Sequence, residues 1–153
     1  ASDVFKLTGS ATKLIRVTRL EAMMTYAGTA VTTAGISAVA YKRSGSYSGG
    51  TAGTAPTVAA LDSTQAAATA TAGTYTAAPT PPSIVAIVRA GRGQAVLNST
   101  HYYTWDFGAS RPSKCPVLRG TTEHLAVLQS AVIAGTSPTV TWNVIAEFTE
   151  EPL

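Results

Sequence analysis

The end of the chain alternates between apolar and polar residues over Thr139–Thr149. The apolar positions are Val140, Trp142, Val144, Ala146 and Phe148, and the polar ones are Thr139, Thr141, Asn143, Glu147 and Thr149. Only Ile145 departs from the alternation. Successive side chains of a strand point to opposite faces, so this segment predicts a half-buried β-strand with a solvated outer face.

Short β-prone segments of the same kind recur along the chain, separated by Gly and Pro. The predicted strands are Val4–Thr8, Thr12–Leu20, Tyr26–Val31, Ile36–Arg43, Ile84–Arg89, His101–Phe107, Pro116–Arg119 and His124–Ser130. Many short strands at a spacing of roughly 8–12 residues are typical of a sandwich or barrel. Because no internal repeat or domain boundary is evident, we predict one all-β domain over residues 1–153, an antiparallel β-sandwich.

Two of these strands carry more specific predictions. Ile84–Arg89 is apolar up to its final Arg, which predicts a strand with both faces buried, ended by Gly91 and Gly93. The nearby glycines therefore predict a hairpin turn at Ala90–Gly93. In His101–Phe107 every second residue is aromatic, which predicts one buried face formed by His101, Tyr103, Trp105 and Phe107.

Three segments lack a clear strand pattern. Ser44–Pro56 is rich in Gly and Ser and predicts a long, mobile loop. Val58–Ala78 resembles a helix start at Asp62, yet its many β-branched threonines disfavour a helix, so we favour short strands and turns over a helix there. Residues 150–153 (EEPL) predict a solvated acidic tail.

The composition suits a protein that packs against neighbours, and it also suits a secreted or extracellular module. Charged residues make up 12% of the 153 residues, about half of the level usual in soluble domains. The net charge of +3 is dispersed along the chain and does not indicate nucleic-acid binding. The single Cys excludes an internal disulfide, and no apolar stretch approaches the ~20 residues of a transmembrane helix. The first residues lack the pattern of a signal peptide, so we expect synthesis in the cytoplasm.

The residues that could support catalysis or metal binding are few and scattered. A hydrolase would combine Cys115 or a Ser with His101 or His124 and an acid such as Asp106, but no G-x-S-x-G signature occurs. Neither the histidines nor the acids show metal-ligand spacing. We therefore predict no catalytic residue, cofactor or metal, and we interpret Cys115 as a small buried apolar residue.

Basic and aromatic residues leave alternatives open. Scattered solvated charge is one interpretation of Lys13, Arg16 and Arg19, and the other is pairing with Glu147, Glu150 and Glu151 of a neighbouring subunit. The aromatic residues that could form a sugar-binding platform are Tyr102, Tyr103, Trp105 and Trp142. Since Trp105 and Trp142 lie on the apolar faces of their strands, we favour a core role for them.

Several segments, taken in order, resemble small virion structural proteins of tailed bacteriophages. They are DVFKLTGSATKLIRVTRLE (3–21), AYKRS and GGT (40–51), LDSTQAAATATAGTYTAAP (61–79), TWDFG and RP (104–112), VLRGT (117–121) and VTWNVIAEFTEE (140–151). The resemblance implies a jelly-roll or related β-sandwich located on the virion, most like a capsid decoration (cement) protein. A tail- or fibre-associated protein is the next choice, and a carbohydrate-binding module is a further alternative.

This resemblance implies the major capsid protein and copies of the chain itself, as in a homotrimer, as partners, with no nucleic acid, membrane or small-molecule substrate. An N-terminal arm (1–8) and the loop at 44–56 are the expected contact segments. The individual contact residues we expect are Val4, Phe5, Arg43, Tyr47, Arg119, Glu150 and Glu151. The expected core positions are Ile15, Val17, Trp105, Val140, Trp142, Val144 and Phe148.

Overall fold

The computed structural model describes residues 2–27, 30–31, 35–62, 64–94, 99–108, 114–129, 135–136 and 139–153. The strands are β1 (Ser2–Thr8), β2 (Lys13–Ala27), β3 (Ala30–Val31), β4 (Gly35–Ser44), β5 (Thr51–Ala52), β6 (Thr71–Ala77), β7 (Ser83–Gln94), β8 (Thr100–Asp106), β9 (Val117–Leu118), β10 (Glu123–Gln129), β11 (Gly135–Thr136) and β12 (Thr139–Pro152). The described residues form no α-helix, and hence none long and apolar enough to cross a membrane.

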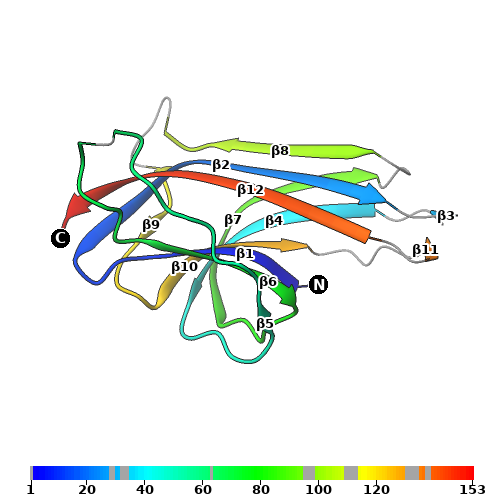
Figure 1. Cartoon of the computed structure of the whole chain (residues 1–153), viewed down its shortest axis with the longest axis horizontal. Coiled ribbons are helices and arrows are strands. Elements are labelled where there is room, and N and C mark those ends of the chain that lie inside the picture. The colour runs from blue at the N-terminus through cyan, green and yellow to red at the C-terminus, as the bar shows by residue number, and fades with distance from the viewer. Residues whose placement is uncertain are drawn as a thin grey trace.

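Within the described residues, the strands form two main antiparallel sheets (Figure 1). The first sheet has the order β5-β6-β1-β10-β4-β7. The second sheet has the order β12-β2-β8, with β9 also paired to β2, and β3 pairs separately with β11. The two main sheets pack against each other, so the predicted antiparallel sandwich is confirmed, whereas the jelly-roll topology stays a prediction.

The core lies between the two sheets and follows from alternation along the strands. In β2 the inward side chains of Ile15, Val17 and Leu20 are fully buried. They belong to the same apolar cluster as Leu7 of β1 and Leu125 of β10 in the opposite sheet. Full burial of one such side chain contributes roughly 1.5–3 kcal/mol, so this layer accounts for much of the cohesion between the sheets.

The C-terminal strand follows its predicted pattern and extends further than predicted. Trp142, Val144 and Phe148 pack against the core, while Ile145 is 57% exposed on the outer face. β12 pairs with β2 as far as Pro152, so residues 150–152 are part of the strand. The predicted acidic tail is therefore part of a strand, although the Glu151 side chain is still 42% exposed. The alternation of apolar and polar residues does not predict this last part of the strand, because ion pairs and hydrogen bonds, and not apolar side chains, attach residues 150 and 151 to the rest of the chain.

The middle of the chain contains β6 and long strand-free stretches. The described part of Val58–Ala78 contains no helix, which confirms strands and turns as the better interpretation. The predicted loop at Ser44–Pro56 contains the short strand β5, and Ser48 forms a bridge with Thr80. The predicted strand Tyr26–Val31 is divided between the end of β2 and β3, and its residues 28–29 lie outside the described residues.

The N-terminal segment is a central strand. β1 pairs with β10 on one side and with β6 on the other. Residues 2–8 therefore already have strand partners within this chain and do not form a free arm that could add to a neighbour's sheet.

The aromatic face predicted for the strand near His101 is confirmed. Tyr103, Trp105 and Phe107 are buried in the core cluster, and His101 is partly buried. Cys115 lies in the same cluster, and its thiol donates a hydrogen bond to the carbonyl oxygen of Phe107 at 3.3 Å. The prediction of a buried, core-packed Cys is confirmed.

Candidate assembly surface

β7 is the edge of the first sheet and exposes an apolar surface. It pairs with β4 on one side, and no strand of the described residues pairs with its other side. Ile84, Val85 and Ile87 are 51%, 58% and 67% exposed. The prediction that both faces of this run are buried is therefore wrong, because the strand lies at a sheet edge where the second sheet does not cover it.

The same strand continues through its glycines. β7 runs to Gln94, so the predicted hairpin turn at Ala90–Gly93 is wrong. A Cβ atom built on Gly91 would lie 2.2 Å from Cδ1 of Tyr103, which belongs to β8 in the second sheet. Gly91 is therefore required by close packing between the edges of the two sheets, as strand glycines often are.

Two bulges make the β7 edge irregular. Ala40 pairs with Arg89 and Tyr41 with Ile87, which leaves Val88 as an extra residue. A second shift between Lys42 and Arg43 leaves Val85 as an extra residue in the same way. Bulges interrupt the hydrogen-bonding ladder and are one of the means by which edge strands avoid pairing with other chains. A partner would therefore contact β7 through its side chains rather than by adding a strand.

The charge on β7 is entirely basic. Arg89 and Arg92 are exposed and follow the apolar residues, and the strand contains no acidic residue. The guanidinium carbon of Arg89 lies 5.5 Å from the ring centroid of Phe107, so the aromatic ring helps to orient this cation. We call the surface formed by Ile84, Val85, Ile87, Arg89 and Arg92 the β7 patch.

Several of the residues expected to contact a partner are instead used inside the chain. Phe5 is only 4% exposed and belongs to the core, and Val4 packs against that core. The Arg43 side chain is 4% exposed and forms an ion pair with the buried Asp3, with Nε 2.8 Å from Oδ2. Arg43 Nη2 also donates to Asp3 Oδ1 at 2.8 Å, and Tyr47 Oη donates to Asp3 Oδ2 at 2.7 Å.

His124 extends this polar cluster next to Tyr47. Its Nε2 lies 2.9 Å from the carbonyl oxygen of Gly45, which can only accept, so Nε2 carries the proton. Its Nδ1 therefore accepts from Thr8 Oγ1 at 3.0 Å. Burial lowers the pKa of His124, and the nearby Lys6 lowers it further, against the raising effect of the Gly45 hydrogen bond. The cluster holds the turn after β4 against β1 and β10.

Tyr47 is the aromatic centre of the same cluster. Its ring stacks on Tyr75 with centroids 5.6 Å apart and meets the His124 ring edge-on at 5.1 Å. Lys6 Nζ lies 4.7 Å from its ring centroid. Burial, reinforced by the hydrogen bond to Asp3, raises the pKa of the Tyr47 hydroxyl, which stays protonated and able to donate.

The acidic residues of β12 are satisfied within the chain. Arg16 Nε lies 2.7 Å from Glu151 Oε1, and Arg19 contacts both Glu147 and Glu21. The backbone N–H groups of Thr69 and Ala70 donate to Glu150 Oε1 at 2.7 and 2.9 Å. Intersubunit pairing is therefore not needed to neutralise these carboxylates.

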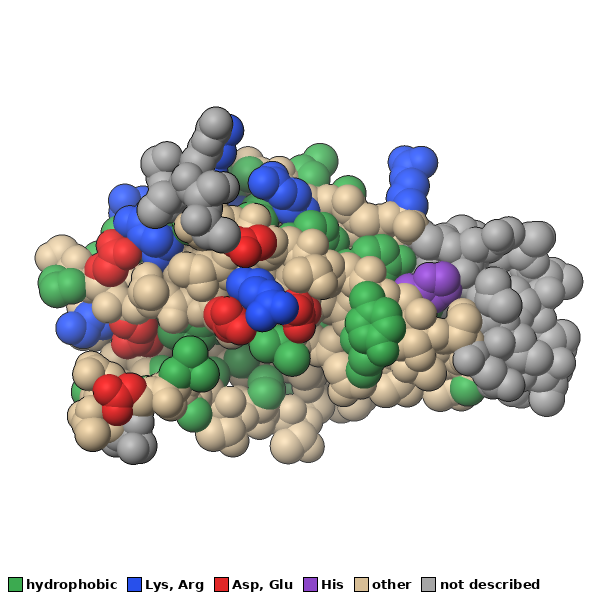
Figure 2. Space-filling view, turned by 90° about the horizontal axis from the view of Figure 1, so that it is seen from above, with side chains coloured by type: hydrophobic (Ala, Val, Ile, Leu, Met, Phe, Trp, Pro, Cys, Tyr) green, Lys and Arg blue, Asp and Glu red, His purple; other side chains and the backbone are tan. Residues whose placement is uncertain are grey.

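The outer face of the second sheet mixes charges of both signs. Figure 2, which views the molecule from the side of β2, β8 and β12, shows acidic and basic side chains next to one another. Arg119 is exposed, and its backbone N–H donates to Glu123 Oε2 at 2.7 Å. Of the expected contact residues, Arg119 alone is largely exposed, and it lies outside β7.

The groups considered for chemistry are the histidines, Cys115, the serines and the acidic residues. His101 Nε2 lies 3.2 Å from Ser99 Oγ, two residues away, while the thiol of Cys115 is buried in the core. Among the described residues, no group of three His, Cys, Asp or Glu side chains is placed to hold a metal ion. The surface feature of the described residues that stands out is the β7 patch. The sequence alone does not reveal it, because an apolar run does not show whether the protein core or a partner buries it.

Comparisons with known proteins add no family to this description. No family model, no curated protein and no solved structure matches the chain.

Proposed function

We propose that this chain is a structural protein of a phage particle, and that it decorates and stabilises the capsid through its β7 patch. The location on a virion rests on the resemblance of its sequence segments to small virion proteins. The mode of attachment rests on one observation, the exposure of Ile84, Val85 and Ile87 on an edge strand.

The exposed apolar residues support a contact surface because they lie close together along one strand. Single exposed apolar residues are normal on proteins, but contiguous ones often mark interaction sites. Ile84, Val85 and Ile87 lie within four consecutive residues of one strand, and the polar side chains that would normally alternate with them are absent. In an assembly, a partner would bury these side chains, which the chain itself leaves exposed.

The partner surface should be apolar with an acidic border. Arg89 and Arg92 extend the β7 patch at one end, and complementary charge across an interface sets orientation and excludes wrong partners. The two bulges favour contact between side chains. Each contact of this size binds weakly, and attachment becomes firm when many copies or many contacts act together on one shell.

Co-sedimentation tests this proposal. The purified chain is mixed with capsids from its own phage that lack it, and the bound fraction is measured as the concentration rises. We expect saturable binding at a fixed ratio to the major capsid protein, weakened by salt because of the basic residues. Absence of binding to heads, with the chain present in intact virions, would contradict decoration and favour a tail location.

A further inference from the structure

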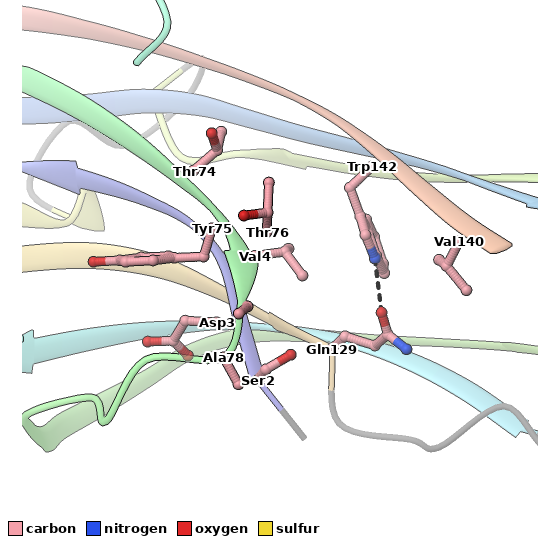
Figure 3. A pocket seen from close by; sticks show the side chains of 11 residues that line it. Ser2, Asp3, Val4, Thr74, Tyr75, Thr76, Ala78, Gln129, Val140 and Trp142 are labelled. Atoms are coloured by element: carbon pink, nitrogen blue, oxygen red, sulfur yellow. Dashed lines mark hydrogen bonds between the residues drawn. The ribbon is translucent and has the colours of Figure 1, made fainter. Parts of the chain in front are cut away.

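A pocket opens between the two sheets at the side formed by β12, β6 and the start of β1 (Figure 3). Its volume is about 380 Å³, which lies in the range of small-molecule sites. Its lining includes Ser2, Val4, Thr76, Gln129, Val140 and Trp142. In the first sheet, β6 lies near one edge and β7 at the other, so the pocket and the β7 patch are on separate parts of the sandwich.

Trp142 provides a flat and preorganised apolar wall for this pocket. Its indole Nε1–H donates to Gln129 Oε1 at 2.9 Å, as Figure 3 shows. Its ring also stacks on Tyr103, with centroids 6.5 Å apart. Trp142 is only partly buried, whereas Trp105 is 9% exposed and belongs to the core cluster. A fixed aromatic side chain binds a ligand without first losing rotamer freedom, which lowers the entropic cost of binding.

The polar part of the lining carries no unneutralised charge. The carboxylate of Asp3 is buried and is held by Arg43 and Tyr47. Thr74 and Thr76 donate their hydroxyl protons to the carbonyl oxygens of Thr54 and Thr51, at 3.1 and 3.3 Å. Their oxygen lone pairs therefore remain able to accept from a ligand. Such a lining favours a neutral, hydroxyl-rich ligand over a phosphate or a carboxylate.

We propose that this pocket binds a neutral sugar residue of a glycan. The C–H groups on one face of a pyranose carry slight positive charge and match the negative face of the Trp142 ring. Sugar hydroxyls would donate to the Thr74 and Thr76 oxygens, and the Ser2 hydroxyl can donate or accept. This proposal does not depend on the β7 patch or on capsid binding, because the pocket and the patch use different residues.

The test follows the two indole N–H signals of the intact chain by nuclear magnetic resonance, since the chain has two Trp residues. The probes are the methyl glycosides of neutral hexoses and of N-acetylhexosamines. We expect at least one glycoside to shift the Trp142 signal saturably and to leave the Trp105 signal in place. If no glycoside shifts the Trp142 signal, or if glucose 6-phosphate binds more tightly than glucose, the proposal is wrong.

Variants test whether the pocket beside Trp142 is the binding site, and a folding control accompanies them. Ser2→Ala removes one hydrogen-bonding group at the pocket and should weaken binding about threefold to tenfold. Trp142→Leu should abolish binding, measured by line broadening of the glycoside's own proton signals because this variant lacks the Trp142 indole, provided that its circular dichroism spectrum matches that of the wild type. The control is Tyr102→Ala, which removes an aromatic side chain that is 73% exposed outside the pocket. Loss of binding in Tyr102→Ala, with binding intact in Ser2→Ala and Trp142→Leu, would overturn the assignment.

Discussion

Single residues differ sharply in how much of the fold depends on them, and ion pairs show this most clearly. The side chains of Asp3 and Arg43 are 0% and 4% exposed, while those of Arg16 and Glu151 are 26% and 42% exposed. Removing one partner of a buried pair leaves an uncompensated charge, whereas an exposed pair contributes little. The ion pair between Asp3 and Arg43 therefore stabilises the fold more than the ion pair between Arg16 and Glu151.

We expect Asp3→Ala to lower the free energy of unfolding by about 3–5 kcal/mol, because it leaves Arg43 buried without its carboxylate. The comparison is Arg16→Ala, which should cost much less, because an ion pair near the surface is screened by solvent. Urea unfolding of both variants at neutral pH measures the difference. Equal costs for the two variants would contradict the buried ion pair.

Gly91 offers a second test at the residue scale. We expect Gly91→Ala to cost about 1–3 kcal/mol, because the new methyl group would overlap the ring of Tyr103, which is itself buried in the core. In the control Gly73→Ala, the nearest atom is the flexible Lys6 side chain at 3.1 Å, so this change should be nearly neutral. Thermal unfolding compares the two, and a stable Gly91→Ala would show that β7 does not pack closely on β8.

His124 makes stability depend on pH. Burial lowers its pKa in the folded state, so below the ordinary value of about 6.5 the unfolded chain binds more protons than the folded one. The stabilising contribution is therefore present above that pH and is lost as the pH falls through the lowered pKa. Lys6, Asp3, Glu123, Arg43 and Tyr47 also face this site, so the wild type must be compared with His124→Gln.

We expect urea unfolding to show a smaller loss of stability between neutral and mildly acidic pH in His124→Gln than in the wild type. The glutamine amide can still donate to the Gly45 carbonyl but takes up no proton in this range. Identical pH dependence of the two proteins would mean that His124 is not held neutral in the fold.

At the scale of elements, substitutions of apolar residues should cost little stability on the edge strand β7 and much more on the central strand β10. We expect Ile87→Lys to change the free energy of unfolding by no more than about 0.5 kcal/mol, because Ile87 is 67% exposed. Leu125→Ala in the fully buried part of β10 should cost about 2–5 kcal/mol. A large loss in Ile87→Lys would show that β7 is covered within the chain.

The alternation of apolar and polar residues predicts most of the strands, but it does not predict which strands lie next to one another. Regular alternation at Thr139–Thr149 and His101–Phe107 predicted the buried faces correctly, because alternate side chains face the core whatever strand lies alongside. The run at Ile84–Arg89 gave no such information, since its residues are apolar on both faces. The glycines at 91 and 93 predict a turn that the structure does not contain, because a Gly required by close packing, such as Gly91, has the same sequence signal as a Gly in a hairpin.

Long-range polar contacts could not be predicted from the sequence. Asp3 and Arg43 are 40 positions apart, and Arg16 and Glu151 are 135 apart. Which charges meet depends on strand order and register, and one register shift reverses every side chain. The strand order and register are not visible in the sequence, so the expected contact residues include two, Phe5 and Arg43, that are buried within the chain.

At the scale of the whole molecule, the proposed attachment surface and the proposed sugar pocket lie on separate parts of the sandwich. The β7 patch lies on one edge of the first sheet, and the pocket beside Trp142 lies near β6 towards the other edge. A protein that attaches through one part can keep the other accessible. The sparse charge of the chain, 12% of its residues, fits a molecule that works in contact with neighbours.

The central claim is that the β7 patch attaches this chain to a capsid. The most direct measurement is capsid co-sedimentation of two matched variants, Ile87→Lys on β7 and Ile145→Lys on β12. Both replace an exposed Ile, 67% and 57% accessible, so neither should unfold the chain. We predict that Ile87→Lys abolishes saturable binding while Ile145→Lys binds like the wild type. Wild-type binding by Ile87→Lys would contradict the claim.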